Sequence, residues 1–345
     1  MNPIRNDYGI LDVPEVVTET QADTLPPILD AAEFLTEKIT LPRELIYGVL
    51  HQGSKMVLGG GSKTFKTWTL LDQAVAVATG EPWLSFKTVK GRVLFLNFEI
   101  QSGFFQQRLH AVSQEKHVAL TKGQIDVWNL RGHATSYTMI LPRISKRVKE
   151  SGYALIVLDP IYKLYGQTDE NSAGEVARLL NAIETLAVDT GAAVSFGAHY
   201  SKGNQAGTEA IDRISGSGVF ARDPDSILNF TRHEEQDAFT VDATLRNFKP
   251  IEPFVVRWQY PLMRRDESLD PAKLKQAGGR PKVHTVEKLI GCLKGRKLKI
   301  QNWLKRAGSE TGISKTRFYA LLEEARKFPQ VKQTVAGEWF YDESR

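Results

Sequence analysis

Gly59-Gly60-Gly61-Ser62-Lys63-Thr64-Phe65-Lys66-Thr67-Trp68 is the stretch of this 345-residue sequence that decides the fold. It lies between a short apolar run, Lys55-Met56-Val57-Leu58, and a segment with helical periodicity at 68–78. Its first glycine and its Lys66-Thr67 pair match the two ends of the pattern G-x-x-x-x-G-K-[ST]. Glycine-rich backbone leading into a helix N-terminus binds anions. The stretch therefore predicts a phosphate-binding loop that joins a strand to a helix.

The candidate phosphate-binding residues are Gly60, Gly61, Ser62, Lys63, Thr64, Phe65, Lys66, Thr67 and Trp68. In such loops the lysine reaches the β and γ phosphate oxygens and the hydroxyl holds Mg²⁺. One position departs from the pattern, because Phe65 replaces the second glycine and a bulky residue does not easily adopt positive φ. Either the loop follows a less demanding path, with Lys63 adding compensating charge, or nucleotide binding is weaker. The alternative interpretation is a surface turn rich in Gly, Ser and Lys.

Length and composition indicate a globular protein of about two domains, at ~150 residues each. Hydrophobic residues make up 41% of the chain, yet no apolar run approaches the ~20 residues that span a bilayer. The N-terminus lacks a basic segment followed by an apolar stretch. The single cysteine, Cys292, cannot form an internal disulfide. These features predict a cytoplasmic protein with no membrane partner.

The chain divides into four predicted regions. Residues 1–40 form a partly ordered arm with a short helical stretch at 31–35. Apolar strands alternate with helical segments over 41–262, which predicts an α/β domain with a mostly parallel sheet. Residues 263–282 are a linker that ends in Gly-Gly-Arg-Pro. Residues 283–345 form a small α+β domain, and the basic charge belongs here: residues 280–345 carry 15 Lys and Arg against 7 Asp and Glu (+8), whereas the rest carries 30 against 33 (−3).

Three predicted strands of the α/β domain end in side chains that bear on phosphate chemistry. The strand at 91–99 ends in Glu99, the strand at 154–159 in Asp159 and the strand at 192–199 in His199. Ligands of open α/β sheets bind at the carboxyl ends of the strands. Glu99 is placed to polarise an attacking water, Asp159 to organise Mg²⁺, and His199 to sense a γ-phosphate. A solvated glutamate and a structural histidine are the simpler alternatives for the first and last.

In the order and spacing of these motifs, residues 45–260 resemble the RecA-like ATPase core of plasmid RepA-type hexameric replicative helicases and their relatives on mobile elements, within the AAA-type P-loop ATPases. The stretches Leu158-Asp159-Pro160, His199-Tyr200-Ser201-Lys202 and Ser215-Gly216-Ser217-Gly218 extend the likeness beyond the phosphate loop. The resemblance implies a homo-oligomeric ring, with a hexamer as the expected size, that holds ATP and Mg²⁺ between neighbouring subunits.

The same resemblance implies roles for single residues. Lys66 and Thr67 bind phosphate and Mg²⁺, Asp159 organises Mg²⁺, and Glu99 is the catalytic base. His199 couples the nucleotide to a loop at 201–212 that faces single-stranded DNA and includes Lys202. The family's arginine finger precedes a Gly-Ser or Gly-Ala pair, a place that Ser215 takes here. Arg213 is the preferred replacement, and a surface salt bridge is its alternative role.

The basic C-terminal region has predicted helices at 284–293, 299–307 and 314–325, followed by two strands joined at Ala336-Gly337. This order resembles a winged helix-turn-helix, whose third helix enters the major groove of duplex DNA. Lys315, Thr316 and Arg317 lie near the start of that helix and are the candidate DNA contacts. A small helical module for oligomerisation or partner binding is the alternative.

Together these features predict an ATP-dependent motor that translocates on or remodels DNA and functions in DNA replication. A DNA-binding regulator or loader that binds ATP with little turnover is the main alternative. A small-molecule kinase is less attractive, because it gives the basic region no purpose.

Overall fold

The computed structural model describes residues 26–133, 136–166, 172–199, 219–220, 222–275 and 285–342. The chain divides into two compact units, Met1–Pro42 and Arg43–Arg345. The first contains α1 (Ala31–Thr36), whose N-cap Asp30 accepts hydrogen bonds from two backbone N–H groups of the first turn. None of the residues of α1 is buried within the chain. The short helix predicted in the N-terminal arm is therefore present.

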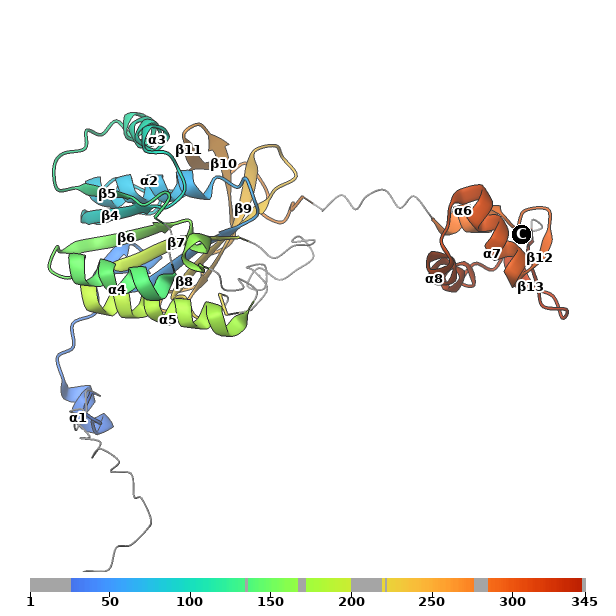
Figure 1. The fold of residues 1–345 in the computed structure, drawn as a ribbon, viewed down its shortest axis with the longest axis horizontal. Helices are drawn as coiled ribbons and strands as arrows, with labels where there is room; N and C mark the ends of the chain where they lie inside the picture. Colours follow the sequence, from blue (N-terminus) through green and yellow to red (C-terminus); the bar gives the residue numbers. More distant parts are fainter. Residues whose placement is uncertain are drawn as a thin grey trace, which may run out of the picture. The chain divides into compact units, whose positions relative to one another are not determined.

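A nine-stranded sheet forms the centre of the second unit, in the order β11-β10-β9-β8-β3-β7-β6-β4-β5 (Figure 1). The strands from β5 to β8 pair in parallel, and β8 to β11 form an antiparallel meander. This confirms the predicted α/β fold with a mostly parallel sheet. The strands are β3 (Lys55–Gly60), β4 (Arg92–Asn97), β5 (Ile125–Asn129), β6 (Tyr153–Asp159), β7 (Ala193–His199), β8 (Ser226–Arg232), β9 (Ala238–Leu245), β10 (Phe254–Gln259) and β11 (Leu262–Arg265). A separate small hairpin contains β1 (Glu44–Ile46) and β2 (Leu50–His51).

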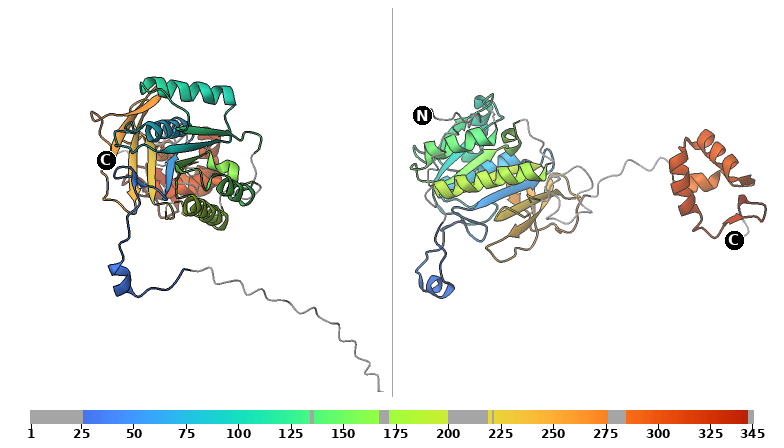
Figure 2. Two further views of the ribbon diagram at one scale, coloured as in Figure 1. Left: turned by 90° about the vertical axis from the view of Figure 1, so that its left-hand side faces the viewer. Right: turned by 60° about the horizontal axis from the view of Figure 1, so that its bottom comes forward.

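Helices cover both faces of the sheet (Figures 1 and 2). On one face lie α2 (Lys66–Thr79) and α3 (Ser102–Glu115), and on the other α4 (Tyr137–Val148) and α5 (Ala173–Thr190). Side chains alternate along β3, so that Met56 and Leu58 enter one apolar cluster and Val57 the other. Because parallel strands point the same way, the phosphate loop, Glu99, Asp159 and His199 follow strands that end at the same edge.

The linker predicted at 263–282 begins too early. Leu262 and Met263 are buried in β11, which pairs with β10. Further along, the N–H of Lys275 donates to the carbonyl of Arg232 at 2.8 Å. The charged pair Arg264-Arg265 hides this edge strand in the sequence, because one side of an edge strand faces solvent. Residues 263–275 therefore belong to the sheet domain.

The described residues 285–342 form a compact set of helices and strands with its own core. They comprise α6 (Val286–Gly291), β12 (Lys297–Lys299), α7 (Ile300–Thr311), α8 (Lys315–Ala325), β13 (Val331–Gln333) and β14 (Glu338–Tyr341). The three helices and the last two strands lie where the sequence predicts them, whereas β12 was not predicted. It pairs with β14, giving a three-stranded sheet in the order β12-β14-β13. Trp303 and Phe318 form the centre of the core, with both rings fully buried.

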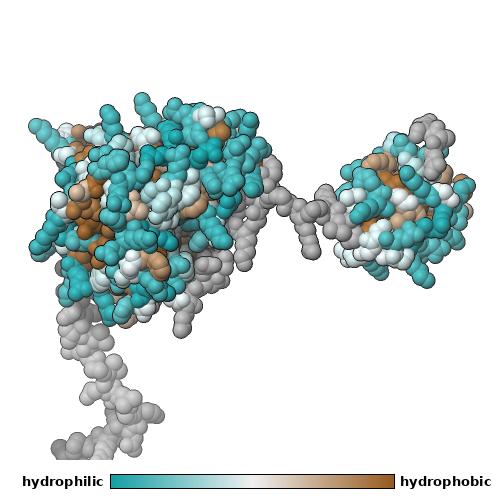
Figure 3. All heavy atoms as spheres, turned by 90° about the horizontal axis from the view of Figure 1, so that it is seen from above, coloured by the Kyte–Doolittle hydropathy of each residue, from teal (hydrophilic) through white to brown (hydrophobic). Residues whose placement is uncertain are grey.

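Hydrophilic side chains cover most of the face seen in Figure 3, with apolar patches between them. In the part of the chain that the structure describes, no helix combines the length and apolar character that crossing a bilayer requires.

Candidate functional site

The loop between β3 and α2 folds back on its own lysine. The Nζ of Lys66 donates hydrogen bonds to the carbonyl oxygens of Gly60 and Gly61, both at 2.8 Å. The buried hydroxyl of Thr64 donates to the carbonyl of Gly61 at 2.9 Å. A Cβ at Gly60 would stand 2.6 Å from the Thr64 hydroxyl, so only glycine fits there. Loop and lysine thus form a compact cradle with a cation at its centre.

Phe65 follows the demanding backbone path, not the easier one. It is the N-cap of α2 at φ 59° and ψ 24°, in the left-handed region, where a bulky side chain is strained. Its ring stacks on Trp258 of β10 at 4.2 Å between ring centroids, and meets Phe239 of β9 edge-on. Aromatic packing therefore offsets the strain, and the predicted less demanding path is wrong.

Trp68 extends this aromatic contact along the first turn of α2. Its ring lies 5.6 Å from Trp258 and 5.4 Å from the exposed ring of Tyr260. The guanidinium of Arg108, on α3, lies 5.0 Å from the Trp68 ring centroid. The side chain of Trp68 is thus engaged in packing, and its backbone N–H is the part that faces an anion at the helix start.

Asp159 is the buried carboxylate of the site. Its side chain is 4% exposed and accepts a hydrogen bond from the hydroxyl of Thr67. Burial raises the pKa of Asp159 to about 6, and the negative charge of Glu99 adds to this, whereas the Thr67 hydrogen bond and Lys66 oppose it. Burial also lowers the pKa of Lys66 to about 8, against the attraction of Asp159. Cation, hydroxyl and carboxylate from two predicted motifs are therefore together.

Glu99 is exposed just beyond the end of β4, in a turn that Asn97 holds. The buried Asn97 side chain accepts from the N–H groups of Glu99 (3.3 Å) and Ile100 (2.9 Å), and donates to the Ile100 carbonyl at 2.7 Å. Asn97 pairs in register with Asp159 of β6, so the two acidic side chains leave neighbouring strands. A polar Asx turn at a strand end was the sequence signal for this support.

His199 reaches the site from the end of β7. Its Nδ1 lies 3.5 Å from the Nζ of Lys66, and its backbone pairs in register with Gly60 of β3. The structure thus brings His199 together with the cradle, as the sequence order suggested. Two other candidates, Lys202 and Arg213, lie outside the described residues.

Of the candidates in the loop, Ser62 and Lys63 are exposed at its tip. The guanidinium of Arg232, at the end of β8, lies 3.4 Å and 3.3 Å from their carbonyl oxygens. Arg232 was not predicted, and neither were Tyr162 and Arg108. The hydroxyl of Tyr162 donates to Oε2 of Glu99 at 3.0 Å, and Arg108 lowers the pKa of Asp159 through its charge. None of these three residues belongs to a short motif, so the sequence carried no signal for them.

The three candidate DNA contacts on α8 are not equivalent. Lys315 and Thr316 are exposed, whereas Arg317 is half-buried. The hydroxyl of Ser314 caps the helix by accepting from the N–H of Arg317 at 3.4 Å. Exposed residues of the first turn thus point away from the core of this region.

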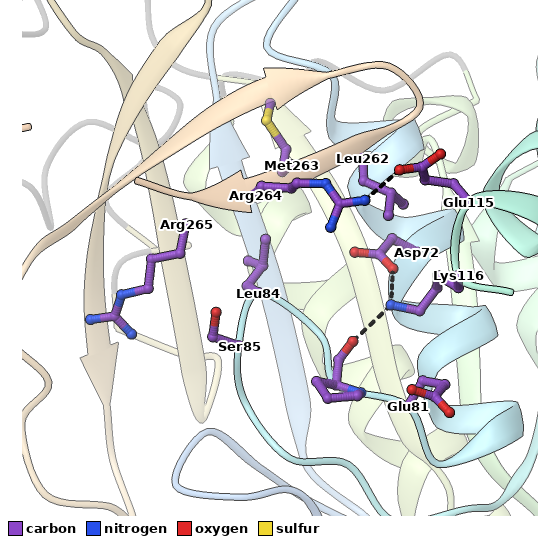
Figure 4. A pocket seen from close by; sticks show the side chains of 11 residues that line it. Asp72, Glu81, Leu84, Ser85, Glu115, Lys116, Leu262, Met263, Arg264 and Arg265 are labelled. Carbon is purple, nitrogen blue, oxygen red and sulfur yellow. Dashed lines mark hydrogen bonds and ion pairs between the residues drawn. The ribbon is translucent and has the colours of Figure 1, made fainter. Parts of the chain in front are cut away.

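A separate pocket of about 420 Å³ lies between α2, the end of α3 and β11 (Figure 4). The buried Asp72 carboxylate forms an ion pair with Lys116 at 2.7 Å inside it, and Arg264 pairs with Glu115. Burial raises the pKa of Asp72. None of the predicted site residues lines this pocket, and its charged side chains mainly pair with one another.

The sequence model of the family described as AAA domain (AAA_25) matches residues 19–205, more than half of the chain. The chain therefore belongs to this family, and its central unit is a RecA-like P-loop ATPase domain. Among curated proteins, none matches the sequence.

Solved structures with a similar fold include an ATPase domain with 13% identity, a TM-score of 0.46 and coverage of 63% of this chain and 86% of that one. A KaiC-like protein of Pyrococcus horikoshii OT3 has 14% identity, a TM-score of 0.46 and coverage of 64% and 93%. The RadB recombinase has 13% identity, a TM-score of 0.45 and coverage of 63% and 92%. The family assignment rests on the sequence match, because these TM-scores lie below 0.5.

Proposed function

We propose that this protein binds ATP with Mg²⁺ at the loop between β3 and α2 and hydrolyses it. The observation that carries the proposal is the cluster of Lys66, Thr67, Asp159 and Glu99 at one sheet edge. The residues fit a nucleotide: Lys66 sits among backbone carbonyls, and in the described part of the chain no carboxylate lies within ion-pair distance of its Nζ. A triphosphate supplies the counter-charge that this half-buried cation lacks.

Mg²⁺ would be held by Thr67 and Asp159 together with phosphate oxygens, since no group of three or more His, Cys, Asp or Glu among the described residues is placed to hold a metal alone. When bound, the ion neutralises phosphate charge. Lys66 then binds and orients the triphosphate, and the carboxylate of Glu99 orients a water and accepts its proton. His199, beside Lys66, is placed to respond to the outermost phosphate.

We further propose that hydrolysis drives work on DNA by a homo-oligomer, with duplex DNA bound by residues 283–345 in a winged-helix manner. The support for this is the +8 charge of residues 280–345 and the exposed Lys315 and Thr316 at the start of α8. The Lys315→Ala variant is expected to weaken duplex binding across sequences and to reduce its salt dependence, because one phosphate contact is lost.

The deciding experiment measures ATP turnover with and without single-stranded DNA, beside native mass. Turnover that rises with DNA and disappears in Lys66→Ala and Glu99→Gln supports the motor. Tight ATP binding without stimulated turnover supports the nucleotide-gated regulator instead. Absence of nucleotide binding with magnesium present would refute both.

A further inference from the structure

Tyr162 is the one neutral donor that the described structure places on the candidate base. It lies on the single 3-10 turn η1 (Ile161–Leu164), which follows β6 only two residues after Asp159. Its hydroxyl donates to Oε2 of Glu99 at 3.0 Å. A tyrosine so close to Asp159 in the chain therefore contacts the carboxylate that leaves the neighbouring strand β4.

Glu99 needs such a contact, because its side chain is exposed and flexible groups in water sample many rotamers. Asn97 holds only the backbone of the turn. Tyr162 binds one carboxylate oxygen, which leaves the other free to accept a proton. A base must lie within hydrogen-bond reach of the water that it activates, so its orientation controls the rate.

The surroundings keep the Tyr162 hydroxyl a donor. Burial, the hydrogen bond to Glu99 and the charge of Asp159 raise the pKa of Tyr162 to about 12, so the phenol stays protonated at neutral pH. The ammonium of Lys163 lies 5.0 Å from the ring centroid, and the His199 ring lies 6.2 Å from it. Tyr162 is thus bordered by elements from both β6 and β7.

We propose that Tyr162 is a positioning residue for ATP hydrolysis, which orients Glu99 through one hydrogen bond and leaves nucleotide binding to other residues. The inference rests on the proposed function, since it assigns a role within that same site. It implies that the tyrosine acts only through Glu99. It also couples the orientation of the base to the segment that carries Asp159.

The experiment compares wild type with Tyr162→Phe, Glu99→Gln and the double variant. Tyr162→Phe is expected to lower kcat about 10- to 100-fold, because a displaced base loses rate on this scale, while the dissociation constant for ATP stays unchanged. In the Glu99→Gln background the same change should have no further effect. The matched control is Tyr153→Phe, which also removes a hydroxyl bound to a carboxylate, that of Asp126 at 2.8 Å, at the far end of β6. It should retain wild-type kcat.

A second readout needs no turnover: the ¹³C NMR signal of the Glu99 side-chain carboxyl, assigned from its loss in Glu99→Gln. Tyr162→Phe should shift this signal, and Tyr153→Phe should not. An unshifted signal, an unchanged or increased kcat, or an effect that persists without Glu99 would overturn the role of Tyr162. A wild-type protein without turnover would instead overturn the proposed function, and with it any part that Tyr162 plays in hydrolysis.

Discussion

Two lysines stand at opposite ends of the path from β3 into α2, and their partners differ. Lys55, buried at the start of β3, forms ion pairs with Asp223 (2.5 Å) and Glu184 (2.8 Å). Lys66, half-buried after the end of β3, meets only the carbonyl oxygens of Gly60 and Gly61 and the ring of His199 among its hydrogen-bonding and ion-pair partners within the described residues, apart from a long contact to Thr64. The first lysine has its counter-charges within the chain. Burial lowers the pKa of the second, which has no such pairing to offset it fully, and this distinguishes a binding lysine from a structural one.

Replacement of each lysine by methionine is the strongest way to break this comparison. Lys66→Met should reduce ATP hydrolysis about 10²- to 10³-fold, since a charge that stabilises the transferring phosphoryl group is lost. Lys55→Met should leave the rate per folded molecule unchanged. Steady-state ATPase assays on both variants test this, and equal rates for the two would contradict the assignment.

The same two variants should reverse their order in stability. Lys55→Met leaves Asp223 and Glu184 without their cation, and we expect a loss of about 2 kcal/mol in the free energy of unfolding; these partners are partly solvated, so the loss is smaller than for a fully buried pair. Lys66→Met removes a poorly paired charge and should not destabilise the protein. Urea unfolding at pH 7 measures both, and a larger loss for Lys66→Met would refute the distinction.

Asp159 sharpens the contrast with a carboxylate. Its pKa is raised, so its charged form reduces stability above the ordinary pKa of 3.8, and this cost is fully present at pH 7. Asp159→Asn should therefore increase the free energy of unfolding by about 2 kcal/mol without ligand at pH 7, while it abolishes hydrolysis. The gain should vanish near pH 4, where the aspartate is protonated in both folded and unfolded protein. An equal gain at both pH values would exclude titration as its cause.

Proton uptake tests the unpaired state of Lys66 directly. With a pKa of about 8, Lys66 is about half protonated at pH 8, and bound phosphate raises that pKa. Binding of ATP at pH 8 should therefore take up about half a proton. Calorimetry in buffers of different ionisation enthalpy measures it. Lys66→Arg is the control, because arginine stays charged and should take up none.

The smallest expected effect concerns Phe65. Phe65→Gly relieves the left-handed backbone strain but loses the stack on Trp258, and we expect a net loss of about 1 kcal/mol in stability. The dissociation constant for ATP should change little, because the loop amides remain. Thermal unfolding and nucleotide titration check this. A large loss of affinity would show that the aromatic packing shapes the cradle itself.

Much of the α/β domain could be predicted from local patterns. The apolar runs around 55–58, 91–99, 154–159 and 192–199 became β3, β4, β6 and β7, because buried parallel strands are almost continuously apolar. The edge strand β11 was missed, since half of it faces solvent and its charged residues look like a linker. Likewise β12 has three residues, Lys297–Lys299, and is a strand only because β14 pairs with it.

Residue order alone was enough to indicate a phosphate loop and the acidic strand ends, because both depend on short-range backbone geometry and on the edge that parallel strands share. Only the folded chain could bring Trp258 under Phe65, Tyr162 onto Glu99 and Arg232 to the loop tip, over separations of 193, 63 and about 170 positions. Such contacts follow from the register and twist of distant strands. No local pattern records them, and they decide whether the lysine that the motif predicts meets a counter-charge within the protein or is left to bind one from a ligand.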